Sequence, residues 1–203
     1  MSVSEQQVQD ALKEITDPNT QKDFVSTKSV KNIKIDGDKV SLDIVLGYPA
    51  KSVIESIRAQ VADKLKSIAG VGSVTVNVSS SIVSHSVQRG VKLIPGIKNI
   101  IAVASGKGGV GKSTTAVNLA LALAAEGARV GILDADIYGP SQPLMLGITN
   151  ERPEPSADGK KLEPLMGHGL QAMSIGFLID PDQPMVWRGP MVTQALEQLL
   201  NET

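Results

Sequence analysis

The residues with the clearest capacity for chemistry lie at positions 106–113, which read Gly-Lys-Gly-Gly-Val-Gly-Lys-Ser. This is the pattern G-x-x-x-x-G-K-[ST], in which the glycines free main-chain N–H groups to surround a polyphosphate. Lys112 stands at the position that reaches the β and γ phosphates, and Ser113 at the position whose hydroxyl binds Mg²⁺. The pattern therefore predicts a site for a nucleotide and its magnesium ion.

The flanking sequence favours this interpretation over an ordinary glycine-rich turn. Residues 100–104, Ile-Ile-Ala-Val-Ala, form an apolar run typical of a buried parallel strand. Residues 113–126 are rich in Ala and Leu, contain no Gly or Pro, and are followed by Gly127 at a helix C-cap position. A strand, a glycine loop and a helix in this order direct the positive end of the helix dipole at a bound anion.

Charged side chains near this loop are further candidates. An apolar strand predicted at residues 129–133 leads into Asp134-Ala135-Asp136, and ligands bind at the carboxyl ends of such strands. We therefore interpret Asp136 as functional, whereas for Asp134 helix capping or a local turn competes evenly with a chemical role. Lys107, set among glycines, is interpreted as functional rather than as a solvated loop lysine.

The first part of the chain has the pattern of a small α+β domain. We predict a helix at residues 3–15, and then strands at residues 30–35 and 40–46 around the turn Asp36-Gly37-Asp38. An amphipathic helix at residues 51–68 and an alternating strand at residues 74–78 complete the order α-β-β-α-β.

These elements predict an α/β fold class in two domains. The α-β-β-α-β domain occupies residues 1–85, a linker rich in turn residues occupies residues 86–98, and the first half of a P-loop NTPase parallel-sheet domain occupies residues 99–203. Within that second domain we predict an exposed excursion at residues 151–168. A strand at residues 170–178 and a helix at residues 190–200 follow.

Composition excludes several classes of protein. The 203 residues carry a formal net charge of −1 with acidic and basic residues mixed, which is unlike a general nucleic-acid-binding surface. The sequence contains no cysteine, so this chain forms no disulfide and no thiolate metal site. Because neither a signal peptide nor a membrane-spanning run is visible, we expect a cytoplasmic protein without a nucleic-acid or membrane partner.

Three segments resemble a known family. With Lys107, the loop at 106–113 resembles the deviant Walker A motif of the MinD/ParA class of ATPases. Residues 133–141, Leu-Asp-Ala-Asp-Ile-Tyr-Gly-Pro-Ser, and residues 185–191, Met-Val-Trp-Arg-Gly-Pro-Met, are similar to segments of the Mrp/ApbC-type iron–sulfur cluster carrier ATPases. The α-β-β-α-β unit resembles the small domain that is often fused ahead of the ATPase in bacterial Mrp proteins.

The resemblance implies an ATPase that acts as a homodimer and transfers iron–sulfur clusters to apo-proteins, with ATP, Mg²⁺ and the cluster as cofactors. It implies that Lys112 binds phosphate, Thr114 helps to hold the α phosphate and Ser113 ligates Mg²⁺. Lys107 would reach across the dimer to the partner's nucleotide, and Asp136 would position the attacking water or a water on Mg²⁺. The nucleotide-binding set is then Gly106, Lys107, Gly108, Gly109, Val110, Gly111, Lys112, Ser113 and Thr114, and the catalytic set is Lys107, Lys112 and Asp136.

The sequence also departs from that family. It has neither the Asp-x-Pro-Pro-Gly segment nor the Cys-Pro-x-Cys motif of the family, and Pro49-Ala50-Lys51 stands where many relatives place a cysteine. We therefore expect a truncated piece of a longer protein without cluster ligands, in which residues 100–103 have an unfilled neighbour and an exposed edge. Such a piece should bind MgATP weakly or not at all, hydrolyse it poorly and carry no cluster.

Two other functions remain as alternatives. One is a spatial-organisation ATPase of the MinD or ParA kind acting on membrane or DNA, against which stand the N-terminal domain and the lack of a visible basic or amphipathic targeting tail. The other is a non-catalytic interaction module, which predicts that residues 1–85 fold alone and bind a partner without nucleotide.

Overall fold

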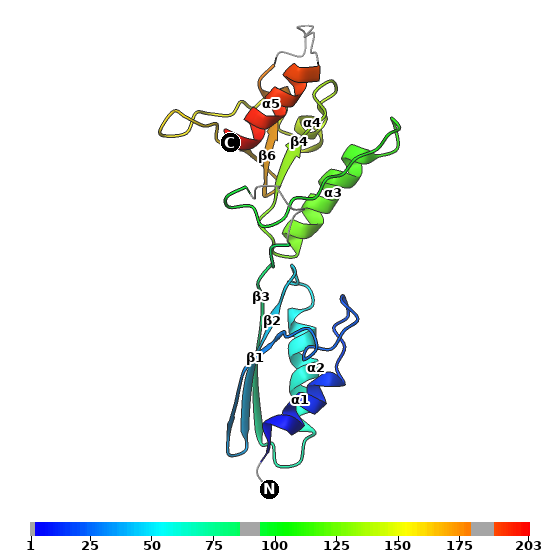
Figure 1. Cartoon of the computed structure of the whole chain (residues 1–203), viewed down its shortest axis with the longest axis vertical. Helices are drawn as coiled ribbons and strands as arrows, with labels where there is room; N and C mark the ends of the chain where they lie inside the picture. The colour runs from blue at the N-terminus through cyan, green and yellow to red at the C-terminus, as the bar shows by residue number, and fades with distance from the viewer. Residues whose placement is uncertain (1–2, 86–93, 180–188) are drawn as a thin grey trace. The chain divides into compact units, whose positions relative to one another are not determined.

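The computed structural model describes residues 3–85, 94–179 and 189–203. The chain divides into two compact units, Met1–Ile100 and Ile101–Thr203, which are described separately. Each unit combines helices with a small β-sheet (Figure 1), and this confirms the predicted α/β class.

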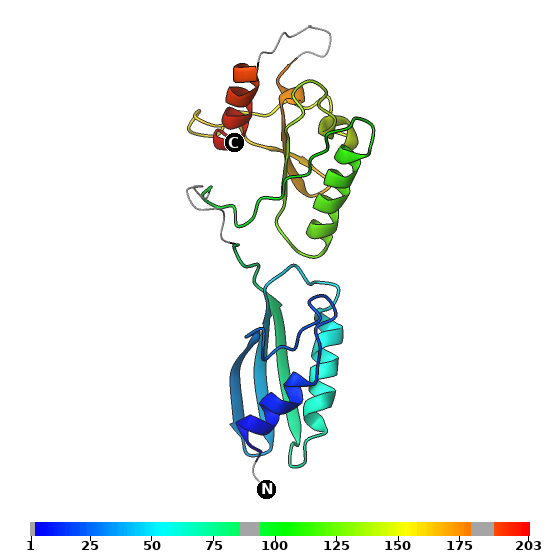
Figure 2. The same cartoon turned by 45° about the vertical axis from the view of Figure 1, so that its right-hand side comes forward.

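The first unit has one mixed sheet covered on one face. The strand order is β1-β2-β3, with β1 antiparallel and β3 parallel to the central strand β2. Both helices lie on the same face of this sheet (Figures 1 and 2), and α2 makes the crossover between the parallel strands. The elements, in the predicted order, are α1 (Glu5–Lys13), β1 (Val30–Asp36), β2 (Lys39–Leu46), α2 (Ile54–Lys66) and β3 (Ser73–Ser80).

Local sequence explains these elements directly. Ser4 caps α1 in a capping box, in which its Oγ accepts from the Gln7 N–H at 3.3 Å while the Gln7 Oε1 accepts from the Ser4 N–H at 3.0 Å. Alternate residues of β2 are buried, and so is one stripe of α2. The core between helices and sheet includes Val8, Leu12, Phe24, Val40, Leu42, Ile44, Leu46, Ile57, Val61 and Leu65.

Two aspartates organise polar groups in the first unit. Asp17, only 4% exposed, accepts hydrogen bonds from the Tyr48 hydroxyl at 2.7 Å and from the Asn19 N–H at 2.9 Å. Burial, followed by this hydrogen bond to Asp17, raises the pKa of Tyr48 well above its ordinary value. On β2, hydrogen bonds from Asn32, on β1, and from Asn77, on β3, lower the pKa of Asp43.

The second unit has three layers. Its sheet has the order β4-β6-β5, with β4 parallel and β5 antiparallel to β6. Helix α3 lies on one side of the sheet and α5 on the other (Figures 1 and 2). Its elements are α3 (Lys112–Ala125), β4 (Gly131–Asp134), α4 (Gln142–Met145), β5 (Leu165–Gly167), β6 (Leu170–Ser174), the 3-10 helix η1 (Ile175–Phe177) and α5 (Gly189–Asn201).

The prediction of a strand at residues 100–104 is wrong. These residues belong to no strand, and the side chains of Ile100 and Ile101 are 67% and 60% exposed. A strand needs a hydrogen-bonded neighbour, and in the described part of the chain β4 pairs with β6 rather than with this segment. Ile100 and Ile101 of this apolar run are therefore exposed, without a partner strand among the described residues.

Other boundaries also differ from the sequence-based expectation. The strand predicted at residues 170–178 ends at Ser174, whose Oγ accepts from the Gly176 N–H at 3.1 Å and begins η1. The excursion at residues 151–168 contains β5, which pairs with β6 through a two-residue turn, His168 and Gly169, both with positive φ. Much of the predicted linker, at residues 86–93, and the segment at residues 180–188 lie outside the described residues.

The helices of the described part of the chain have at most 14 residues. Within the described residues, none of them combines the length and the apolar character that crossing a membrane requires.

Candidate functional site

The glycine loop is an open turn that leads directly into α3. Gly109 and Gly111 have φ values of 73° and 87°, in the left-handed region that favours glycine. Helix α3 begins immediately afterwards, and no side chain caps its first turn. A Cβ added at Gly106, Gly108, Gly109 or Gly111 would meet no atom within 4 Å, so the main chain is open to a ligand. The geometry thus fits an anion at the start of the helix.

Two of the predicted site residues come together at this loop. The Lys112 Nζ lies 2.9 Å from the Asp136 Oδ2, although the two residues are 24 positions apart in the sequence. The contact is half-buried, with the two side chains 34% and 37% exposed. Lys112 is the first residue of α3, and Asp136 follows the end of β4 by two residues. The strand end and the helix start therefore present opposite charges to one another.

The remaining predicted residues lie along the loop and the first turn of α3. Ser113 is half-buried, whereas Lys107 and Thr114 are exposed. The main chain of Lys107 pairs with the Ser105 hydroxyl, which accepts from the Lys107 N–H at 3.1 Å and donates to its carbonyl at 2.9 Å. The Thr114 carbonyl accepts from the Asn118 side chain at 2.8 Å. Lys107 is thus an exposed residue whose main chain is held in a tight turn by Ser105.

Asp134 makes the local-turn and helix-start contacts that the sequence suggested as an alternative to a chemical role. Its Oδ1 accepts from the Asp136 N–H at 3.1 Å, and its Oδ2 accepts from the N–H groups of Ser141 and Gln142 at 2.8 and 2.9 Å. The same carboxylate therefore makes a local turn and satisfies the start of α4.

Gln142 is a residue that the sequence reasoning missed. Its side chain is buried, with 4% of the residue exposed, and its Nε2 donates to the Ser113 carbonyl at 3.3 Å. A serine followed two residues later by a proline, as in Ser141 and Pro143, is typical of a helix start and could have located α4. The contact with Ser113 carried no sequence signal, because it depends on how α4 packs against α3.

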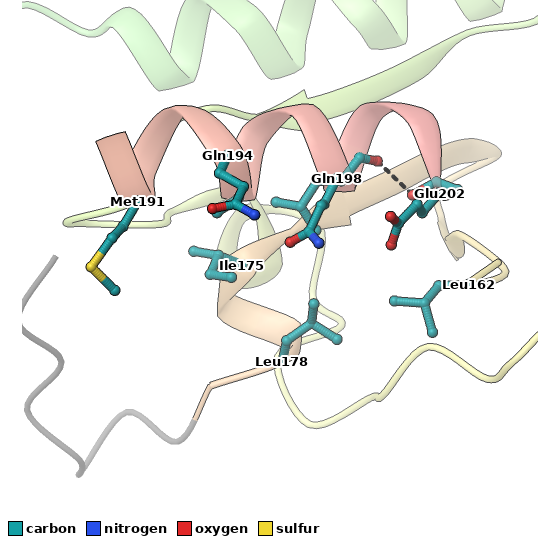
Figure 3. Close-up of a pocket in the computed structure, with 10 residues that line it drawn as sticks. Leu162, Ile175, Leu178, Met191, Gln194, Gln198 and Glu202 are labelled. Atoms are coloured by element: carbon teal, nitrogen blue, oxygen red, sulfur yellow. Dashed lines mark hydrogen bonds between the residues drawn. The ribbon is translucent and has the colours of Figure 1, made fainter. Parts of the chain in front are cut away.

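A pocket lies elsewhere in the second unit. It has a volume of about 340 Å³ and is formed by α5, η1 and the segment around Leu162. Figure 3 shows Leu178, Ile175 and Met191 facing this pocket beside the glutamines of α5, with the Gln198 carbonyl accepting from the Glu202 N–H at 2.8 Å. The glycine loop does not line this pocket.

The available donor atoms suit magnesium better than a cluster. The Ser113 hydroxyl and the Asp136 carboxylate are oxygen ligands of the kind that Mg²⁺ prefers. Iron–sulfur clusters are held by thiolates, and the sequence contains no cysteine. In the described ranges, no group of three or more His, Asp and Glu side chains is placed to hold a metal ion.

Two family models match this chain. Residues 96–203 match a family model described as "ParA: NUBPL iron-transfer P-loop NTPase", and residues 5–78 match one described as "Iron-sulfur cluster assembly protein". These matches cover the glycine loop, the Asp134–Asp136 segment and nearly all of the first sheet.

Curated relatives match along nearly the whole chain. Proteins named "Iron-sulfur cluster carrier protein" from Haemophilus influenzae and Escherichia coli are 45% and 47% identical over 97% and 92% of this chain. One of the same name from Synechocystis is 44% identical over 93% of it. The matches cover 53%, 50% and 54% of those proteins, so the chain spans about half the length of the curated relatives it matches. Because the first of the two family models covers more than half of the chain, including its glycine loop, the chain belongs to the family of iron-transfer P-loop NTPases, and the predicted resemblance to iron–sulfur carrier ATPases is confirmed.

Proposed function

We propose that this chain binds MgATP weakly at residues 106–114 and forms part of a cytoplasmic carrier that transfers iron–sulfur clusters to apo-proteins. The observation that carries the proposal is the 2.9 Å contact of Lys112 with Asp136 at an open glycine loop. The names of the relatives, which match both units, support the cluster-carrier part of the proposal. Because the sequence contains no cysteine, the thiolates for a cluster would come from outside these 203 residues.

The roles of the site residues follow from their chemistry. Main-chain N–H groups of the loop and the Lys112 ammonium bind the phosphates, and Thr114 helps to hold the α phosphate. Ser113 and Asp136 would hold the magnesium ion, Asp136 through a water molecule. When bound, that ion neutralises charge on the β and γ phosphates. On nucleotide binding, Lys112 would exchange Asp136 for a phosphate, and the Asp136 carboxylate would then be free to hold the metal.

Substitution of Lys112 tests the nucleotide part of the proposal. Lys112→Ala removes a charged hydrogen-bond donor to phosphate, and we expect nucleotide affinity to fall by about 100-fold. The measurement is the protection of the amides at 106–115 from hydrogen exchange during a titration to millimolar MgATP, since we expect weak binding. Lys160→Ala, at an exposed lysine of the same unit, is the matched control. Equal protection of the Lys112→Ala and wild-type chains would refute the assignment.

Lys107 tests the homodimer. We propose that this exposed lysine supplies a positive charge to the partner's nucleotide, as an arginine finger does. Lys107→Ala should then leave nucleotide binding to the monomer intact but abolish MgATP-dependent dimerisation, measured by analytical ultracentrifugation with and without MgATP. A wild-type chain that remains monomeric in saturating MgATP would count against this role.

A further inference from the structure

A buried carboxylate stands behind the glycine loop. Asp134, at the end of β4, is 5% exposed, and both of its oxygens accept hydrogen bonds. Its Oδ1 accepts from the Asp136 N–H at 3.1 Å, and its Oδ2 accepts from the Ser141 N–H at 2.8 Å and the Gln142 N–H at 2.9 Å. The Ser174 hydroxyl lies 3.5 Å from the same Oδ2. Such donors make a charged group tolerable in a protein interior.

These hydrogen bonds hold both ends of one loop. The Asp136 N–H belongs to the start of the segment 135–142, and the Ser141 and Gln142 N–H groups belong to its end. The Asp136 carboxylate is then directed by two further contacts, Oδ2 to the Lys112 ammonium at 2.9 Å and Oδ1 to the Gly139 N–H at 3.2 Å. The main chain of Asp136 is therefore held by Asp134 without the help of Lys112.

The loop is also tied to α3. Gln142 donates its main-chain N–H to Asp134 and its side-chain Nε2 to the Ser113 carbonyl at 3.3 Å. Ser113 follows Lys112 in the first turn of α3. A path of hydrogen bonds thus runs from Asp134 through Gln142 to the residue next to the phosphate-binding lysine. Hydrogen bonds thus connect the Asp136 loop, through Asp134 and Gln142, to the first turn of α3.

We infer that Asp134 is a positioning residue, which keeps Asp136 at the magnesium site when Lys112 turns from Asp136 to a phosphate. The inference rests on the proposed nucleotide function. Without Lys112, the Asp136 side chain keeps only the Gly139 N–H among the contacts described above. The hydrogen bonds to Asp134 then provide the remaining restraint on the Asp136 main chain.

Hydrogen exchange in the nucleotide-free chain tests the restraint itself. Asp134→Asn keeps the size of the side chain, but its NH₂ group cannot accept, so the N–H groups at one end of the loop lose their acceptor. We expect the affected amides, those of Ser141 and Gln142 or that of Asp136, to exchange about 10- to 100-fold faster, the factor for losing hydrogen bonds to a charged group. Asp158→Asn is the matched control, because the Asp158 Oδ1 accepts from the Lys160 N–H at 3.2 Å in an exposed turn. Unchanged exchange in Asp134→Asn would overturn the inference.

The magnesium dependence of ATP affinity separates positioning from mere folding. Each chain is titrated with ATP in the presence of Mg²⁺ and in the presence of a chelator. We expect Asp134→Asn to reduce the gain in affinity from Mg²⁺ about tenfold and to leave magnesium-free binding, which depends on the glycine loop, unchanged. An unchanged gain alongside faster exchange would reduce Asp134 to a structural residue and overturn the inference.

Two further results remain informative. If Asp134→Asn does not fold, Gln142→Met removes only the donor to the Ser113 carbonyl at similar volume and should reduce the magnesium gain in the same direction. No reduction in that variant would overturn the inference.

If the wild-type chain binds ATP under neither condition, the proposed function fails. Exchange that is nevertheless faster in Asp134→Asn would show that the restraint exists without a nucleotide site.

Discussion

The two units of this chain differ in how completely their secondary structure is paired. In the first unit the strands β1, β2 and β3 have seven, eight and eight residues and lie in one sheet under two helices. In the second unit β4, β5 and β6 have four, three and five residues, and the apolar segment at residues 100–104 stays outside the sheet. The unit that contains the glycine loop therefore has the shorter sheet.

Both units contain a similar turn around a buried aspartate. Asp17 and Asp134 are buried, and each accepts from the N–H two residues later, at 2.9 and 3.1 Å. Asp17 is completed by Tyr48 and stabilises a loop of the first unit. Asp134 instead holds Asp136 beside Lys112. The same turn is structural in one unit and supports the candidate site in the other, because different tertiary neighbours surround it.

The largest effects should come from removing the buried phenylalanine of each unit. Phe24 and Phe177 are 1% and 0% exposed, and truncation of such a side chain to alanine destabilises by about 3–5 kcal/mol. We expect Phe177→Ala to unfold the second unit, whose sheet is shorter, and Phe24→Ala to leave the first unit folded at lower stability. A denaturant titration monitored by hydrogen exchange in each unit measures the loss of stability in the two variants. Phe→Leu at each site is the control, and the opposite ranking would contradict the comparison.

An intermediate effect is expected at Tyr48. Its raised pKa means that its contribution to stability is complete below about pH 10, its ordinary pKa, and is lost as the pH rises beyond that value. Tyr48→Phe should destabilise the first unit by about 1 kcal/mol at neutral pH, by removing the hydrogen bond to Asp17, and should weaken the alkaline decline. Urea unfolding between neutral and alkaline pH measures this.

A matched control for Tyr48 lies in the second unit. Tyr138 is 71% exposed, so Tyr138→Phe should leave the stability of the first unit and its alkaline decline unchanged. A Tyr48→Phe chain with the full wild-type alkaline decline would show that Tyr48 is not its source.

The smallest effect is expected at the exposed apolar segment. Because Ile100 and Ile101 are exposed, replacing both with threonine should change the free energy of unfolding by no more than about 0.5 kcal/mol. Ile132→Thr, on β4, is the comparison and should destabilise by more than about 1 kcal/mol. Thermal unfolding measures both, and an equal loss at the two sites would mean that residues 100–104 are paired after all.

The features that the sequence predicted are those set by neighbours a few residues apart. The capping box at Ser4, the alternation along β2, the amphipathic stripe of α2 and the glycine loop before α3 depend on local spacing. The missed features depend on distant partners. β5 requires β6, and the Gln142 contact requires α3 to lie against α4.

The family, the α/β class and the glycine loop at residues 106–113 could be predicted from the sequence, because motif spacing and side-chain type at nearby positions suffice for these. Three features became evident only in the structure: Lys112 contacts Asp136, Asp134 is buried and accepts from the Asp136 N–H, and residues 100–104 form no strand. Hydrogen-bond partners and sheet neighbours depend on packing between segments that are far apart in the sequence. The local sequence of an apolar run or a carboxylate therefore does not identify its partner.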